Sequence, residues 1–211
     1  MIHRLSQFLA LAFTSLALVH TASAKAGVID LSGTWRFELD AENGGLDQKW
    51  AARTLADTVK LPGTTDENKK GILNEEAPID RLARVWYWKG PAWYQRDVEI
   101  PANWKGKRIT LFLERTKHCQ VWINGSYYAG WDNTLSAPHI HDLTKGIRPG
   151  EKNTITLLVD NAKLPPGGPS HQVDERTQTN WNGVVGVMEL RADDPVWIKD
   201  VQVYPNASKR E

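Results

Sequence analysis

Apolar and polar residues alternate along several short segments of this chain, and turn residues bound each segment. Alternation with a period of two places one set of side chains on a buried face of a strand and the other on the solvent face. The segments are rich in β-branched and aromatic residues, which β-strands favour. The pattern predicts strands over residues 33–40, 84–90, 93–100, 108–115, 119–125, 153–161 and 197–204.

The residues between these segments indicate how the strands connect. Asn124-Gly125 and Pro149-Gly150 are pairs typical of tight turns, and such pairs recur at the spacing of antiparallel sandwiches. Only residues 46–56 show a helical pattern, in which Trp50 and Leu55 roughly share a face. We therefore predict an all-β fold of two packed antiparallel sheets with at most one short helix.

The first 24 residues form a pattern of their own. Arg4 is followed by an uncharged apolar stretch over 8–19 and then by Ala22-Ser23-Ala24, which is the pattern of a secretory signal peptide. The stretch is too short for a membrane helix, which needs about 20 apolar residues. We expect a protein that is secreted or periplasmic, with residues 25–211 as its single mature domain.

Charge and cysteine content narrow the possible partners. The whole chain has 26 basic and 25 acidic residues, and removal of residues 1–24 takes away Arg4 alone, so the mature domain is formally neutral. Since no Lys/Arg cluster is present, we expect neither nucleic acid nor membrane as a partner, and a neutral ligand fits better. Cys119 is the only cysteine, which excludes an intrachain disulfide, and its apolar strand context indicates a buried, inert thiol.

The amide residues Asn180 and Asn182 flank Trp181 just before the apolar run of residues 184–190. An indole can cover the apolar face of a pyranose while neighbouring polar groups bond to the sugar hydroxyls, whose burial is otherwise costly. We predict that an ordered loop over residues 171–182 binds a carbohydrate. Its candidate ligand-binding residues are His171, Asp174, Gln178, Asn180, Trp181 and Asn182.

The same loop does not suggest catalysis. Asp174 and Glu175 are adjacent and would point to opposite sides of an extended chain, whereas a retaining glycosidase needs two carboxyl groups about 5–5.5 Å apart.

His139 and His141 alternate as same-face strand neighbours, but zinc sites usually show several ligands at tight spacing. We interpret these histidines as surface or edge-strand residues, and we predict no catalytic residue, no metal and no cofactor.

Context also divides the tryptophans, of which the chain has ten. Trp35, Trp122 and Trp197 lie in apolar strand patterns, which predicts that they belong to the core. Trp131 and Trp181 have Asp and Asn neighbours, so a place in the core and a place at the surface or in a pocket stay equally open for them.

Five stretches of the sequence match one known domain in the same order, over about residues 28–205. Among them are LPGTTDEN at 61–68 and TQTNWNGVVGVMEL at 177–190. Together they resemble the N-terminal domain of family 2 glycoside hydrolases, which include β-galactosidases, β-glucuronidases and β-mannosidases. The resemblance implies a sugar-binding jelly-roll β-sandwich of the galactose-binding-domain type. In the family this domain precedes an immunoglobulin-like domain and a catalytic (β/α)₈ barrel.

The resemblance carries no catalytic residue onto this chain. The family's acid/base and nucleophile glutamates belong to the barrel, which takes about 250 residues, and the sequence ends at Glu211. We expect a domain that binds sugar without hydrolysing it alone, either as a partial product of a longer enzyme or as a free-standing sandwich. Its expected partners are a carbohydrate and either the missing catalytic domains or another chain.

One position departs from the family pattern. In the family, the loop ahead of a strand glycine often supplies an acidic residue that helps to hold the sugar. Alignment of that glycine on Gly183 places Thr177 at the acidic position. Either the loop is shaped differently, or His171, Gln178 and Asn180 make the contact instead.

Two other functions fit the same sequence. A free-standing carbohydrate-binding module would bind sugar by itself. A structural domain for a partner chain would instead expose an apolar patch at Trp86, Trp88 and Trp93 and have no affinity for sugar.

Overall fold

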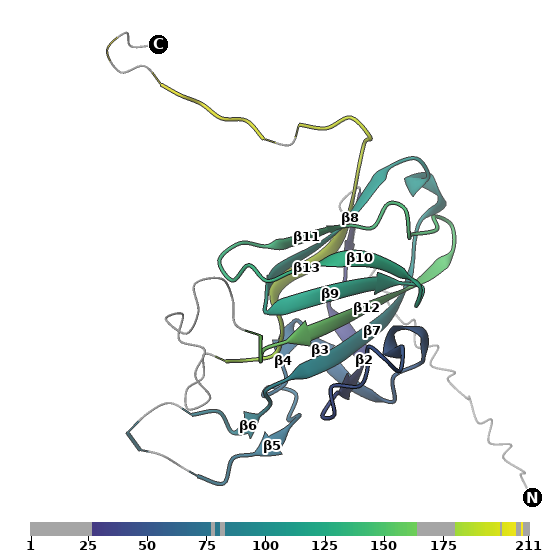
Figure 1. Cartoon of the computed structure of the whole chain (residues 1–211). Coiled ribbons are helices and arrows are strands. Elements are labelled where there is room, and N and C mark those ends of the chain that lie inside the picture. Colours follow the sequence, from purple (N-terminus) through teal and green to yellow (C-terminus); the bar gives the residue numbers. More distant parts are fainter. Residues whose placement is uncertain are drawn as a thin grey trace, which may run out of the picture.

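Two antiparallel sheets face one another and form a β-sandwich in the computed structural model (Figure 1). The structure describes residues 27–76, 79–80, 83–163, 180–198, 200–205 and 208, so the predictions for residues 1–24 lie outside it. The all-β fold is confirmed, while the jelly-roll connectivity stays a prediction. In the part of the chain that is described, no helix has the length and apolarity needed to cross a membrane.

The two sheets differ in size. One has five strands in the order β1-β13-β8-β11, with β4 paired to β13, and the other has six in the order β10-β9-β12-β7-β2-β3. The first sheet contains β1 (Val28–Asp30), β4 (Gly63–Thr64), β8 (Arg108–Thr116), β11 (His139–Asp142) and β13 (Gly183–Asp193). The second contains β2 (Gly33–Leu39), β3 (Asp57–Leu61), β7 (Pro91–Glu99), β9 (His118–Ile123), β10 (Tyr127–Asp132) and β12 (Lys152–Asp160). A separate hairpin of β5 (Ile72–Leu73) and β6 (Trp86–Tyr87) lies beside the sandwich (Figure 1).

The core lies between the sheets and follows the predicted alternation. Leu111 of β8, Val121 of β9 and Leu157 of β12 are fully buried in one cluster, together with Trp35 as predicted. The Asn124-Gly125 pair forms the predicted turn between β9 and β10, and both of its residues have positive φ, 52° and 70°. Such a turn suits the twist of a hairpin, and it fixes which residues of β9 face the core.

No α-helix forms over residues 46–56, where the sequence allowed at most one short helix. Only a 3₁₀ turn, η1 (Trp50–Ala52), forms there, because Lys49 before it adopts a left-handed conformation with φ 54° and ψ 47°. Asp40 accepts hydrogen bonds from the backbone N–H groups of Gly44 and Gly45, at 2.8 and 2.9 Å, and so holds the preceding loop. A second 3₁₀ turn, η2 (Ala102–Trp104), follows β7. Tertiary contacts therefore override a weak helical periodicity.

The strand predicted over residues 197–204 is wrong. The described residues of this segment form no strand, and in Figure 1 the segment runs away from the sandwich. Trp197, predicted to be core, is 41% exposed and lies under the guanidinium of Arg108. A strand needs a partner that accepts and donates its ladder bonds, and alternation alone does not supply one. The strand predicted over 84–90 likewise shortens to β6.

Trp122 differs from its prediction in a smaller way. Its side chain is half-buried and packs outside the main core, against Trp93 with ring centroids 5.2 Å apart. The segment of η1 covers this outer face of the six-stranded sheet through the buried Leu55. The sandwich therefore has a small second cluster of aromatic residues on that sheet.

Replacing Asp97 with asparagine should destabilise the fold at neutral pH but not in acid. Hydrogen bonds from Arg36 lower the pKa of Asp97 below 3.8, helped by a bond from Thr154, against the cost of burial. A depressed folded-state pKa gives stability that is present above the unfolded pKa and lost as pH falls through the folded pKa. Urea unfolding of Asp97→Asn should show a loss of about 1 kcal/mol at pH 7 that shrinks toward pH 2. A constant difference at every pH would contradict this.

Candidate functional site

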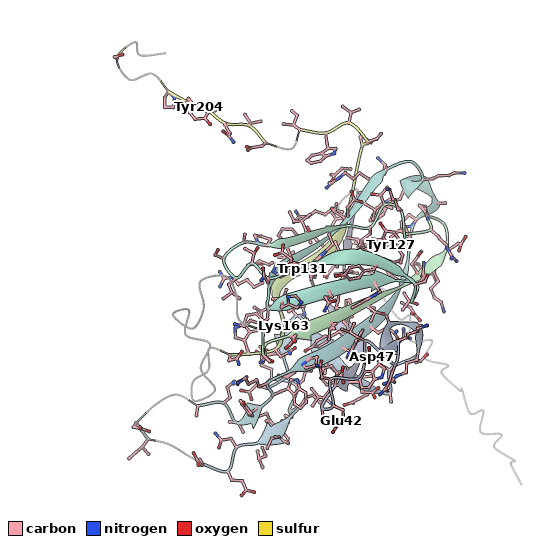
Figure 2. All side chains as sticks on the ribbon, in the orientation of Figure 1. Glu42, Asp47, Tyr127, Trp131, Lys163 and Tyr204 are labelled. Carbon is pink, nitrogen blue, oxygen red and sulfur yellow. The ribbon has the colours of Figure 1, made fainter. Side chains whose placement is uncertain are left out.

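One end of the sandwich gathers the residues just before β13, the start of β9 and the end of β12. Figure 2 labels Trp131 and Lys163 at this end and Tyr127 at the other end of β10. The β5–β6 hairpin is attached to the same region, since the backbone N–H of Trp86 donates to a carboxylate oxygen of Asp66 at 3.0 Å. We call this region the Asn180–Asn182 end.

Asn182 fixes the chain where it enters β13. Its buried amide nitrogen donates to the carbonyl oxygens of Gly90 at 2.9 Å and Val159 at 3.0 Å. Its amide oxygen accepts from the hydroxyl of Tyr94 at 2.8 Å. These bonds join β13 to β7 and β12 in the opposite sheet. Both N–H groups and the amide oxygen are engaged inside the protein, so we assign Asn182 to positioning the segment.

Asn180 is equally buried but differently connected. Its backbone carbonyl accepts a hydrogen bond from the amide of Asn161 at 3.1 Å, and Asn161 also donates to the carbonyl of Trp88 at 2.9 Å. The side-chain amide of Asn180 makes no hydrogen bond to the described part of the protein. A buried amide without a partner costs about 1–3 kcal/mol, so it is a ready donor and acceptor for a ligand.

Trp181 lies between these two asparagines and carries a cation on its face. The ammonium nitrogen of Lys117 is 4.7 Å from the centroid of the indole ring. Lys117 comes directly before β9 and is only 7% exposed. Cation–π contact of this kind is worth more when both groups are withdrawn from water.

A second buried cation, Arg84, lies close enough to influence Lys117. Its side chain is 6% exposed, and its guanidinium carbon lies 5.2 Å from the ring centroid of Tyr87. Within the described residues, none of its three guanidinium nitrogens makes a hydrogen bond. Asp66 attracts the charge of Arg84, but this attraction supplies no hydrogen-bond acceptor for the N–H groups of the guanidinium.

The pKa shifts report that both cations at this end are desolvated. Burial lowers the pKa of Lys117, and the charge of Arg84 lowers it further. Burial also lowers the pKa of Arg84, partly opposed by Asp66. A bound anion would stabilise the desolvated guanidinium of Arg84, which makes no hydrogen bond to the described residues.

Gly183, the first residue of β13, allows β13 to pack closely against β4. Its φ is +134°, a conformation that other residues rarely adopt, and a Cβ there would collide with the backbone oxygen of Gly63. The close approach allows β4 to pair with β13 through Gly183 and Val184. Glycine at this position therefore has a steric cause.

The fold around this end is that of a known family. A family model described as the sugar binding domain of glycosyl hydrolases family 2 matches residues 28–193. The chain belongs to glycosyl hydrolase family 2. The match spans every strand of the sandwich from β1 to β13.

Two relatives of this family 2 chain are both named β-glucuronidase. The β-glucuronidase of Paenibacillus borealis is 33% identical over 143 residues, which cover 65% of this chain and 22% of that protein. Human β-glucuronidase is 23% identical over 168 residues, which cover 72% of this chain and 24% of that protein. The chain thus matches less than a quarter of the length of each of these two relatives.

Solved structures agree on the fold. The β-glucuronidase of Ruminococcus gnavus superposes with a TM-score of 0.59 at 19% identity, over 79% of this chain and 28% of that one. An uncultured Clostridium β-glucuronidase gives 0.61 at 21% identity, over 80% of this chain and 29% of that one. At these identities the likeness shows the fold alone.

The structure brings together three of the six predicted sugar-binding residues. Asn180, Trp181 and Asn182 meet at one end of the sandwich, whereas His171, Asp174 and Gln178 lie outside the described residues, as does Thr177. The sequence reading missed Arg84 and Lys117. Arg84 begins the strand predicted over 84–90 and Lys117 lies between two predicted strands, but nothing in their immediate sequence indicates that these cations are buried.

The patch proposed for a structural partner does not form. Trp93 is buried, and Trp86 and Trp88 are half-buried, with Trp88 packed against the core. The three indoles therefore do not make one exposed apolar surface.

The histidine pair lies on an edge strand, as one of its two interpretations had it, but not on the surface. His139 and His141 lie on β11, at the edge of the five-stranded sheet, but both face inward and are buried. Burial lowers the pKa of His141 to about 4, so its ring is neutral at pH 7. Burial raises the pKa of the nearby Cys119 thiol, as expected for an inert cysteine.

Proposed function

We propose that this chain is the sugar-binding domain of a secreted β-glucuronidase, and that its Asn180–Asn182 end binds the acidic sugar. The observation that carries the proposal is the buried guanidinium of Arg84, which makes no hydrogen bond to the described residues, near the buried ammonium of Lys117. The names of the relatives support a glucuronide as the substrate. Hydrolysis would be carried out by another part of the enzyme.

Each group at this end has a partner on a glucuronide. The uronate carboxylate can accept two parallel hydrogen bonds from Arg84, the geometry in which arginine binds carboxylates most strongly. Trp181 can cover an apolar face of the pyranose, and the free amide of Asn180 can bond to a ring hydroxyl. The expectation of a neutral ligand followed from the net charge of the domain, whereas two buried cations, Arg84 and Lys117, lie at this end.

The β5–β6 hairpin supports contact with further protein. Ile72 and Leu73 are exposed, as is Val85 just before β6. Exposed apolar residues that cluster on one element are typical of a contact surface. We propose that another part of the enzyme covers this hairpin, beside the bound sugar.

Replacing Trp181 with alanine tests the site directly. Loss of the indole should weaken binding of D-glucuronate about threefold to tenfold, the usual worth of an aromatic contact. Isothermal titration calorimetry on the chain measures this. Trp197→Ala is the matched control, because Trp197 lies on the exposed segment after β13. Equal affinities for both variants would remove Trp181 from the site.

A further inference from the structure

Three side chains that could bind a metal converge between the two sheets, and none of them is among the residues proposed to bind the sugar. Cys119 projects inward from β9 of the six-stranded sheet, while His139 and His141 project inward from β11 of the other. One possible ligand atom from each residue lies within 4.8 Å of those of the other two. All three side chains are buried.

The hydrogen bonding of His139 leaves a nitrogen lone pair free. Its Nε2 lies 2.8 Å from the carbonyl oxygen of Thr134. A carbonyl can only accept, so Nε2 carries the proton and Nδ1 is the unprotonated nitrogen. Nδ1 is buried and makes no hydrogen bond to the described residues. The fold therefore fixes the tautomer and leaves a donor atom for a metal.

His141 supplies a second such nitrogen. Its Nε2 is also buried without a hydrogen-bond partner among the described residues. The two rings stand nearly edge to face, with centroids 6.1 Å apart. Burying two imidazole nitrogens without hydrogen-bond partners, beside one thiol, costs free energy of folding unless a ligand bonds to them.

The surroundings resemble the outer shell of a metal site. Histidine ligands usually donate their second N–H to a carbonyl or carboxylate, which orients the ring. His139 does so to Thr134, and a carboxylate oxygen of Asp132 lies 3.7 Å from the same Nε2. Asp132 in turn is held by the backbone N–H of Thr134 at 2.8 Å.

We propose that Cys119, His139 and His141 bind a zinc ion. One thiolate and two imidazoles suit Zn²⁺, with water in a fourth position. The thiol proton is released to solvent when the metal–sulfur bond forms. The ion joins β9 to β11 and so links the two sheets on the side where the sandwich has its edge strands β10 and β11.

Neighbouring polar residues are not part of this set. His118 faces the other way and stacks on Trp131, with ring centroids 5.4 Å apart. Asp142 accepts a hydrogen bond from the backbone of Thr144 and is exposed. Both residues therefore serve as controls.

Cobalt provides the test because its spectrum reports the ligands. The metal-free chain is titrated with Co²⁺, and a thiolate-to-cobalt charge-transfer band should grow to one equivalent and disappear when Zn²⁺ is added. Zinc at about 100 times its dissociation constant should raise the melting temperature by roughly 5–10 °C. His118→Gln should behave like the unchanged protein.

Substitution of the ligands decides the proposal. Cys119→Ala should abolish the charge-transfer band, and His141→Gln should abolish the shift in melting temperature. His141→Gln keeps the thiol, so it stays informative if Cys119→Ala does not fold. If the unchanged chain shows neither the charge-transfer band nor the shift in melting temperature, the proposal is overturned. Water alone would then bond to the two imidazole nitrogens. An unchanged band in Cys119→Ala would place the cobalt elsewhere and would also overturn it.

Discussion

Replacing Asn182 with alanine should lower the free energy of unfolding by roughly 3–5 kcal/mol, since several buried groups lose their partners. The Tyr94 hydroxyl and the carbonyl of Val159 would each lose a bond inside the core, at 2.8 and 3.0 Å in the intact protein. Most domains are stable by only about 5–15 kcal/mol, so this is a large share. Thermal unfolding should show a melting temperature about 10 °C lower.

A surface asparagine provides the comparison for this variant. Asn103 is exposed on η2, and Asn103→Ala should change stability by no more than about 0.5 kcal/mol. If Asn182→Ala were as mild as Asn103→Ala, the segment before β13 would be held by other contacts. Asn182 would then have no positioning role.

Replacing Arg84 with glutamine should weaken binding of D-glucuronate by roughly 10- to 100-fold, the worth of hydrogen bonds between charged groups. The folded state should not suffer comparably, because the guanidinium is buried without hydrogen bonds to the described residues. Removing it relieves desolvation, and costs the attraction of Asp66 and a cation–π contact with Tyr87, which is worth about 0.5–1 kcal/mol. Calorimetry measures the affinity, and urea unfolding measures the stability.

Arg108→Gln is the matched control for this charge. Arg108 also lies over an aromatic ring, that of Trp197 at 4.2 Å, but it begins β8, and the proposed site lies beyond the other end of that strand. Glucuronate binding should not change in Arg108→Gln. A loss of stability in Arg84→Gln without a loss of affinity would assign Arg84 to the fold rather than to the ligand.

The sequence predicted the sandwich because strand alternation is a local property. Leu111, Val121 and Leu157 face the core as their period of two requires, and Asn124-Gly125 turns where expected. The failures are not local. Residues 197–204 alternate between apolar and polar as a strand does. Strand pairing also depends on which sheet edge lies nearby in space, and local alternation carries no information about this.

The site was predictable only where its residues are adjacent. Asn180 and Trp181 attract attention because an indole lies between amides, but Arg84 and Lys117 are far from them in sequence. Their burial arises when β6 and β9 are placed beside the start of β13. His139, His141 and Cys119 show the same limit, since two different sheets bring them together.

Titrating D-glucuronate and D-glucose separately into the chain in a calorimeter tests whether the Asn180–Asn182 end recognises the carboxylate of the sugar. The two sugars differ at one carbon, which bears a carboxylate in the first and an alcohol in the second. The buried cations at the Asn180–Asn182 end predict millimolar or tighter binding of glucuronate and at least tenfold weaker binding of glucose, a difference of about 1.4 kcal/mol or more. Equal affinity for the two sugars, or no heat of binding with either, would contradict the claim.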